Sequence, residues 1–446
     1  MKKILASVGM VALGAASMHA QYAPGLSPLE MSKPWSVAAS LRGFYDDNYL
    51  TLPNGYDGRG SRPPTSAGME VTPSVAFNHS VETTLMSASY IYDLEWYENK
   101  STTDQSHQFN ARLSHEFSEK YKLAVHETFV IAQEPTVIDP SIVSTPLRVE
   151  GNNMHNTAGA DFMAELTKLF DLHLAYNNNV YAYQQKAPDV VGYPFNLTYP
   201  SRSADLDRME QLATVDIRWK ALPETTGVLG YQYGHIDYTS PEAIIYVAPV
   251  PPTVPPTTKP AVFSNIRNDD EHFVYVGVDQ SFREDLNGSI RVGGEYLDYY
   301  KDGGLKELSP YIDASLTWQY LPGSSVLAGV KHEHSSTDVT GGGIGSNESP
   351  VLDADVTAAY ISLTHKMTDK ITASVMGQAQ YSTFNGGGAG FNGRDENFYV
   401  LTMNLAYHIN PWWMTELGYN YSKLNSEIPY RSYTRNMVYV GVRATY

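Results

Sequence analysis

Apolar residues recur at every second position along almost the whole of this chain, and this period constrains its fold more than any other feature. In the last nine residues, Val438, Val440, Val442, Ala444 and Tyr446 alternate with polar or small side chains. Successive side chains of a β-strand point to opposite faces, so the pattern predicts strands with one apolar face. No convincing amphipathic helix interrupts it between residues 35 and 446. The sequence therefore predicts an all-β protein.

The period-two segments and the breaks between them predict about eighteen strands. Sixteen would remain if one weak hairpin were misread. The predicted strands span residues 35–48, 69–78, 83–97, 105–117, 121–132, 153–166, 170–184, 206–219, 226–238, 271–282, 288–300, 309–320, 324–335, 353–365, 370–383, 396–409, 412–423 and 434–446.

The connections between these segments alternate in length. Residues 49–68 and 133–152 form long connections, whereas residues 79–82 and 167–169 form short ones. A β-sandwich has no reason to place all of its short connections at one end along the whole chain. A transmembrane up-and-down barrel does, because short turns join its strands on one side and long loops on the other. The predicted fold is thus a transmembrane antiparallel β-barrel with both termini at the end that carries the short turns.

Aromatic residues form two bands that coincide with this asymmetry. Their rings suit a membrane interface, where one end of the side chain is dry and the other wet. The first band lies beside the short turns and comprises Phe117, Tyr121, Phe170, Trp219, Phe282, Tyr320, Trp412, Trp413 and Tyr446. The second lies towards the long loops and includes Tyr45, Tyr92, Trp96, Tyr233, Tyr299 and Tyr421. We interpret the bands as the two aromatic girdles of a membrane barrel.

The first twenty residues predict a secretory signal peptide. Lys2 and Lys3 precede an uncharged stretch, and small residues lead to Ala20, after which we expect cleavage. Residues 21–34 would then be a short periplasmic segment, and residues 35–446 the barrel.

Two segments resemble Gram-negative outer-membrane β-barrels. The terminal run Val438 to Tyr446 is similar to the signal that the barrel-assembly machinery reads, although that signal usually ends in phenylalanine. The run Ser40-Leu-Arg-Gly-Phe-Tyr-Asp-Asp-Asn-Tyr49 resembles the first strand of the putative β-barrel porin families. The resemblance implies a barrel in the outer membrane, surrounded by lipid and lipopolysaccharide. Its turns would be periplasmic and its long loops extracellular.

Composition and motifs exclude several other functions. The 446 residues include no cysteine, which rules out disulfides, thiolate metal sites and cysteine nucleophiles. A formal charge of −17 makes nucleic acid a poor partner, because phosphates require a basic face. The glycine runs at 341–345 and 386–393 have acidic neighbours, but their spacing matches no calcium loop. His332, Glu333 and His334 lack a third orienting group, so we predict no catalysis, metal or cofactor.

Assigning the apolar face of each strand to lipid leaves a charged face that points inward. Acids outnumber bases on that face, which predicts a water-filled lumen with a mild preference for cations. Alternatively, the charges pair across neighbouring strands and stabilise the wall, and both interpretations can hold together. The pore-lining candidates are Arg42, Asp93, Glu95, Arg112, Glu116, Asp161, Glu165, Asp216, Arg218, Arg291, Glu295, Asp313, Lys331, Glu333, Glu416 and Arg443.

The predicted function is passive diffusion of small hydrophilic solutes, since barrels of about 16–18 strands leave an aqueous channel. The proline-rich residues 239–270 are expected to form a stiff exposed loop. Its apolar run at 243–248 is the feature that supports the alternative, a loop folded inward to narrow the pore. Two other classes stay open: a surface or adhesion barrel that conducts little, and a dedicated transporter of a polymer or hydrophobic solute. The oligomeric state is left open.

Overall fold

The computed structural model describes residues 33–55, 60–132, 153–186, 200–245, 262–302, 304–341 and 349–446. The predicted signal peptide and almost all of the predicted periplasmic segment lie outside the described residues. Within the described ranges, no helix is long and apolar enough to cross a membrane.

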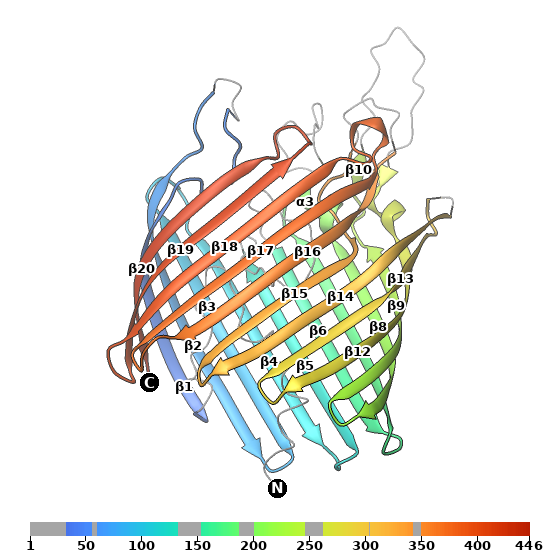
Figure 1. The fold of residues 1–446 in the computed structure, drawn as a ribbon. Coiled ribbons are helices and arrows are strands. Elements are labelled where there is room, and N and C mark those ends of the chain that lie inside the picture. The colour runs from blue at the N-terminus through green and yellow to red at the C-terminus, as the bar shows by residue number, and fades with distance from the viewer. Residues whose placement is uncertain are drawn as a thin grey trace.

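Eighteen strands form one closed antiparallel sheet, which confirms the predicted barrel and its larger strand count (Figure 1). Each strand pairs with the next one along the chain, and β1 pairs with β20 to close the ring. The strands are β1 (Trp35–Asp46), β2 (Ser66–Val81), β3 (Thr84–Tyr97), β4 (Asp104–Glu116), β5 (Tyr121–Ala132), β6 (Asn153–Glu165), β7 (Phe170–Tyr183), β8 (Arg208–Leu222), β9 (Thr225–Tyr238), β12 (Asp269–Arg283), β13 (Leu286–Tyr299), β14 (Leu305–Leu321), β15 (Ser324–Ser335), β16 (Val351–Lys366), β17 (Ile371–Gly386), β18 (Asp395–His408), β19 (Trp413–Ser426) and β20 (Tyr433–Thr445).

The ring closes because the first and last strands continue the same ladder. Ala38 lies opposite Thr445, and Asp46 lies opposite Met437. The ladder extends one step further, where the Tyr446 amide donates to the Val37 carbonyl at 2.8 Å. Closure gives every wall strand a neighbour on both sides, which is what a sheet needs where no water can satisfy its backbone groups.

The two faces of the wall differ in chemistry. Along β8, Val215 and Ile217 are exposed on the outer face, whereas Asp216 is buried on the inner face. Most of the predicted girdle aromatics face outward, but Tyr299 does not. It is fully buried and packs with Leu297 of its own strand and Leu352 of β16. Its position near a long loop suggested a girdle, yet its place in the alternation of β13 turns it inward.

Short turns gather at one end of the barrel and long loops at the other, as predicted (Figure 1). Four small elements in the long loops were not predicted. They are α3 (Arg202–Leu206), η2 (Ser264–Arg267), η3 (Gly388–Gly390) and the hairpin of β10 (Ala243–Ile245) with β11 (Val262–Phe263). Ser201 caps α3, because its Oγ accepts a hydrogen bond from the Ala204 amide at 3.0 Å. These elements are too short to produce a recognisable period.

One junction in the wall is incomplete. The ladder between β14 and β15 ends at Ile312 and His332, although both strands continue towards the long-loop end. Beyond that point β14 still pairs with β13, and β15 still pairs with β16.

Candidate functional site

The charged inner face of the barrel is the first part of the candidate site. Along each strand, its members alternate with outward apolar residues, and none of them is classed as exposed. The structure thus places all the predicted pore-lining candidates on the buried or half-buried side of the wall: Arg42, Asp93, Glu95, Arg112, Glu116, Asp161, Glu165, Asp216, Arg218, Arg291, Glu295, Asp313, Lys331, Glu333, Glu416 and Arg443. It does not gather them into one cluster.

Around the closing junction the charges are tightly packed. The Arg42 guanidinium donates to Glu416 Oε1 at 2.7 Å and to Glu70 Oε1 at 3.0 Å. All three side chains are at most 6% exposed. The Tyr439 ring covers the guanidinium, with its centroid 4.6 Å from Arg42 Cζ. One guanidinium thus offsets part of the charge of two carboxylates away from water.

The neighbouring acids of β3 are held by hydroxyl groups. Thr72 Oγ1 contacts Asp93 Oδ1 at 2.7 Å, and the Tyr97 hydroxyl donates to Glu95 Oε2 at 2.8 Å. Both acids are buried. This part of the wall is consequently packed rather than open.

The wall from β6 to β13 is looser. His173 lies between two acids, with Nδ1 3.1 Å from Asp216 Oδ2 and Nε2 3.4 Å from Asp161 Oδ1. The Asp161 side chain is 45% exposed. Arg218 and Arg291 both bind Asp279, at 2.5 and 2.7 Å. Their side chains keep access to the interior, so this wall presents charge that solvent can reach.

Most of the other candidates also pair with charges on the same or an adjacent strand. Glu116 binds Lys122 at 2.7 Å, Glu165 binds Lys220 at 3.4 Å, and Lys331 binds Glu333 at 2.7 Å. Asp313 lies between Arg291 and Lys331 in the strand register. The pairing interpretation thus describes much of the wall, as the sequence had allowed.

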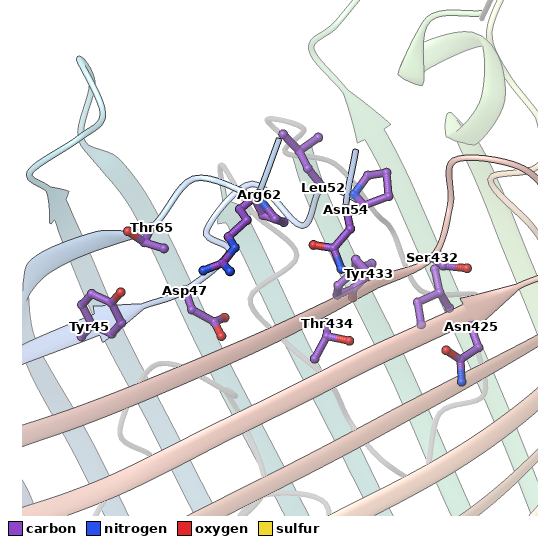
Figure 2. Close-up of a pocket in the computed structure, with 13 residues that line it drawn as sticks. Tyr45, Asp47, Leu52, Asn54, Arg62, Thr65, Asn425, Ser432, Tyr433 and Thr434 are labelled. Carbon is purple, nitrogen blue, oxygen red and sulfur yellow. The ribbon is translucent and has the colours of Figure 1, made fainter. Parts of the chain in front are cut away.

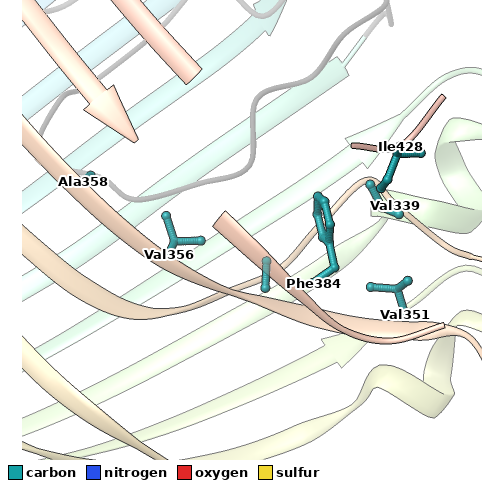
Figure 3. Close-up of a cluster of buried hydrophobic side chains, with 7 residues drawn as sticks. Val339, Val351, Val356, Ala358, Phe384 and Ile428 are labelled. Carbon is teal, nitrogen blue, oxygen red and sulfur yellow. The ribbon is translucent and has the colours of Figure 1, made fainter. Parts of the chain in front are cut away.

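Extracellular loops form the second part of the candidate site. We call residues 200–207, 240–245, 262–268, 336–341 and 427–432 the loop cluster. Val339 and Ile428 from two of these loops pack with Val356 and Phe384 on the inner face of β16 and β17 (Figure 3). Those loops therefore fold over the inner wall of the barrel mouth.

Two buried arginines hold the loop cluster together. Arg267 donates to the backbone carbonyls of Asp205, Thr337, Val339 and Val351, at 2.7 to 3.3 Å. Three separate stretches of chain thereby converge on one guanidinium.

The second arginine is Arg431, which binds Asp338 at 2.8 Å and Glu396 at 2.9 Å. Burial alone would lower the pKa of Arg431, but the two carboxylates outweigh it and raise that pKa above its usual value. The same Asp338 lies 3.8 Å from Arg202 of α3. Charge pairing therefore links three loops to the wall.

In the described part of the proline-rich loop, residues 243–245 are buried rather than exposed. Ala243, Ile244 and Ile245 are at most 6% exposed. The two isoleucines join a cluster that includes Ala204 of α3 and Ile266 of η2. The apolar run identified in the sequence thus supplies a small core. The remaining prolines, at 249–260, lie outside the described residues.

Part of the chain is similar to a known protein family. Residues 232–446 match a family model described as putative beta-barrel porin 2. The match confirms the predicted resemblance to the putative β-barrel porins. The C-terminal part of this chain thus resembles the porin-like outer-membrane β-barrels. No curated protein matches it.

Among solved structures, the porin-like barrel is similar to three proteins at low identity. OccAB3 from Acinetobacter baumannii is 12% identical, with 92% of this chain and 99% of that chain covered and a TM-score of 0.42. A BenF-like porin from Pseudomonas fluorescens Pf-5 is 11% identical, with coverages of 93% and 99% and a TM-score of 0.44. OprD from Pseudomonas aeruginosa is 9% identical, with coverages of 92% and 95% and a TM-score of 0.40.

A cavity of about 710 Å³ opens at the extracellular rim of the barrel (Figure 2). It lies between the loop after β1 and the ends of β19 and β20. Asp47, Arg62 and Asn54 line one side, and Tyr433 and Asn425 line the other. Its walls offer charges of both signs and several amide and hydroxyl groups.

Sequence reasoning missed several charged residues of the inner face. Glu70, Asp279 and His173 all take part in the pairs described above. The sequence pattern could have revealed them, because each of these residues alternates with apolar or small residues on its own strand. The loop-cluster residues Arg267 and Arg431 had no such signal, since they lie in irregular segments.

Asp205, an acid of the loop cluster, has a raised pKa. Burial raises the pKa of Asp205 in α3 to about 7, although Arg267 and Arg202 oppose the shift. Docking of α3 against its neighbours therefore favours the protonated carboxyl.

Proposed function

We propose that this barrel is a porin through which small hydrophilic solutes diffuse passively, with a mild preference for cations. The observation that carries the proposal is the half-exposed charged wall from β6 to β13, where Asp161, Arg218 and Asp279 keep solvent access. A channel sealed by packing would have filled this surface with apolar contacts. Barrels of this strand number also leave room for water.

The proposed selectivity depends on which acids remain accessible. Glu295 and Glu416 are buried and bound to other groups, so they contribute little field to a lumen. Asp161, Glu116 and Asp313 are better candidates because they are half-buried. Paired bases offset part of their charge, which supports a mild rather than strong preference.

The loop cluster supports a size limit. Val339 and Ile428 pack on the inner wall, and Arg431 binds Glu396 on that same wall. We propose that these loops form the narrowest part of the path and that the cavity at the rim is an entry vestibule. Solute size would then be limited at the extracellular mouth.

The last strand, β20, bears on how the barrel is assembled in the membrane. Val438 and Val440 are exposed on the outer face of β20, and Val442, Ala444 and Tyr446 continue the pattern. We propose that these residues form the signal for the barrel-assembly machinery. In this proposal the protein contacts lipid and lipopolysaccharide and has no catalytic role.

The test is conductance in a planar bilayer. The refolded full chain should give discrete current steps, and the reversal potential across a KCl gradient should report cation preference. The double variant Asp161→Asn, Asp313→Asn should shift that potential towards zero or anion preference. Asp369→Asn is the matched control, because this acid is 98% exposed in a short turn outside the barrel wall.

Two results would count against the proposal. Silence under conditions where a control porin conducts would favour a surface or adhesion barrel. The second result would be the same reversal potential for the wild type, the double variant and the Asp369→Asn control. It would show that Asp161 and Asp313 do not determine the cation preference.

A further inference from the structure

Side chains replace backbone pairing at the extracellular ends of β14 and β15. The ladder stops at Ile312 and His332. Beyond it, the His334 amide donates to Glu295 Oε2 at 3.1 Å, and Ser309 Oγ donates to Asp355 Oδ1 at 3.2 Å. The junction is thus lined with polar groups from β13, β14, β15 and β16.

His334 lies at the centre of this junction. Its side chain is 1% exposed, and Nδ1 is 3.3 Å from Asp355 Oδ1 and 3.4 Å from Asp353 Oδ1. Glu307 approaches from β14. One donor atom each of Glu307, His334 and Asp355 lies within 4.8 Å of the other two. Three strands therefore bring one imidazole and two carboxylates together.

Two buried atoms here have no hydrogen-bond partner among the described residues. They are His334 Nε2 and Asp353 Oδ2, in residues that are 6% and 5% exposed. Leaving such atoms unsatisfied costs free energy, so a further group bound at this junction would stabilise it. The Nδ1 atom faces Asp355 and Asp353, so the tautomer protonated on Nε2 turns its Nδ1 lone pair towards these carboxylates.

We propose that Glu307, His334 and Asp355 bind a divalent transition-metal cation, represented by Zn²⁺. An imidazole nitrogen with carboxylate oxygens is a donor set that suits Zn²⁺ and its neighbours, whereas Ca²⁺ and Mg²⁺ prefer oxygen alone. Two carboxylates balance the charge of the ion. Asp355 is 32% exposed, which leaves an approach for the ion and for water as a further ligand. Asp353 is a positioning residue beside the site, because its Oδ1 lies 3.4 Å from the same Nδ1.

The geometry needs only a small contraction. Bonds of about 2.0–2.2 Å place the donors of a tetrahedral ion about 3.5 Å apart, so donors up to 4.8 Å apart move by about 1 Å. Rotation of the half-buried Glu307 and Asp355 side chains supplies this movement. The bound ion would tie β14 to β15 and β16 where their ladder is missing.

The experiment is a metal titration of the full chain, refolded in detergent without a histidine tag. Calorimetry with ZnCl₂ should show one ion per chain, and Co²⁺ should give visible absorption bands from a site with nitrogen and oxygen ligands. His334→Gln should weaken Zn²⁺ binding at least about tenfold, and Asp353→Asn should weaken it less. His332→Gln is the matched control, because this adjacent histidine contacts Thr357 Oγ1 at 2.7 Å instead. It should bind like the wild type.

The outcomes are separable from those of the conductance test, since no readout here involves transport. Absence of Zn²⁺ binding by the wild type at micromolar concentrations would overturn the proposal. Equal losses in His332→Gln and His334→Gln would also overturn it, because the junction would then not be the site. Folding of each variant is checked by its heat-dependent mobility on a gel. Should His334→Gln fail to fold, Glu307→Gln on β14 tests the same site.

Discussion

Two junctions in the same barrel wall are held by different means. At the closing junction, β1 and β20 pair along a continuous ladder, and Arg42 adds ion pairs to Glu70 and Glu416. At the junction of β14 and β15, the ladder ends early and side chains such as Glu295 take its place. The difference shows that a barrel wall can be continuous through its backbone or through its side chains.

The two solutions have different energetic consequences. Arg42 and its carboxylates are out of water, so their desolvation is offset only while the set is complete. The β14–β15 junction instead relies on single hydrogen bonds and leaves polar atoms unsatisfied. The closing junction should therefore be the stronger of the two and the more sensitive to loss of one charge.

The largest expected effect is at the closing junction. Arg42→Met removes the guanidinium that binds the buried Glu70 and Glu416 and should lower the free energy of unfolding by about 3–5 kcal/mol. Urea unfolding in lipid vesicles measures it. The triple variant Arg42→Met, Glu70→Gln, Glu416→Gln removes all three charges and should recover a large part of the loss. A single variant as stable as the wild type would contradict the asymmetry between the junctions.

The closing junction was predictable from the sequence only in outline. Val438 to Tyr446 and the first strand show a period of two, and this local signal defines the strands. The contact between Arg42 and Glu416 depends on the register between the two ends of the chain, which no local pattern specifies. Glu70 illustrates the same limit, because its inward position was readable but its partner was not.

The β14–β15 junction was not predictable at all. The alternation continues through Glu333, His334 and Ser335 as in any other strand, so nothing in the sequence indicates that the ladder stops. Glu307, His334 and Asp355 come from three strands and form no spaced motif. Likewise, Ala243 to Ile245 was expected in an exposed loop because prolines surround it, yet α3 and η2 provide a core for it.

A smaller effect is expected where a side chain replaces the ladder. Glu295→Ala removes the acceptor of the His334 amide and leaves that buried N–H unsatisfied, at a cost of about 1–3 kcal/mol. Glu295→Gln is the control, because its amide oxygen can still accept the bond. Hydrogen exchange at His334, corrected for intrinsic rates, should accelerate in the alanine variant and change little in the glutamine variant. Equal protection in both would mean that Glu295 does not substitute for the ladder.

The smallest effect is expected at an ion pair that sits on an intact ladder. Lys306 binds Asp298 at 3.4 Å across β13 and β14, and the two residues are direct neighbours in the register. The lysine side chain is 56% exposed, so solvent screens the pair and it should contribute little to the free energy of unfolding. Lys306→Met should therefore unfold at nearly the same urea concentration as the wild type. A loss as large as that of Glu295→Ala would show that the ladder between β13 and β14 also depends on its side chains, and the contrast between the two kinds of junction would fail.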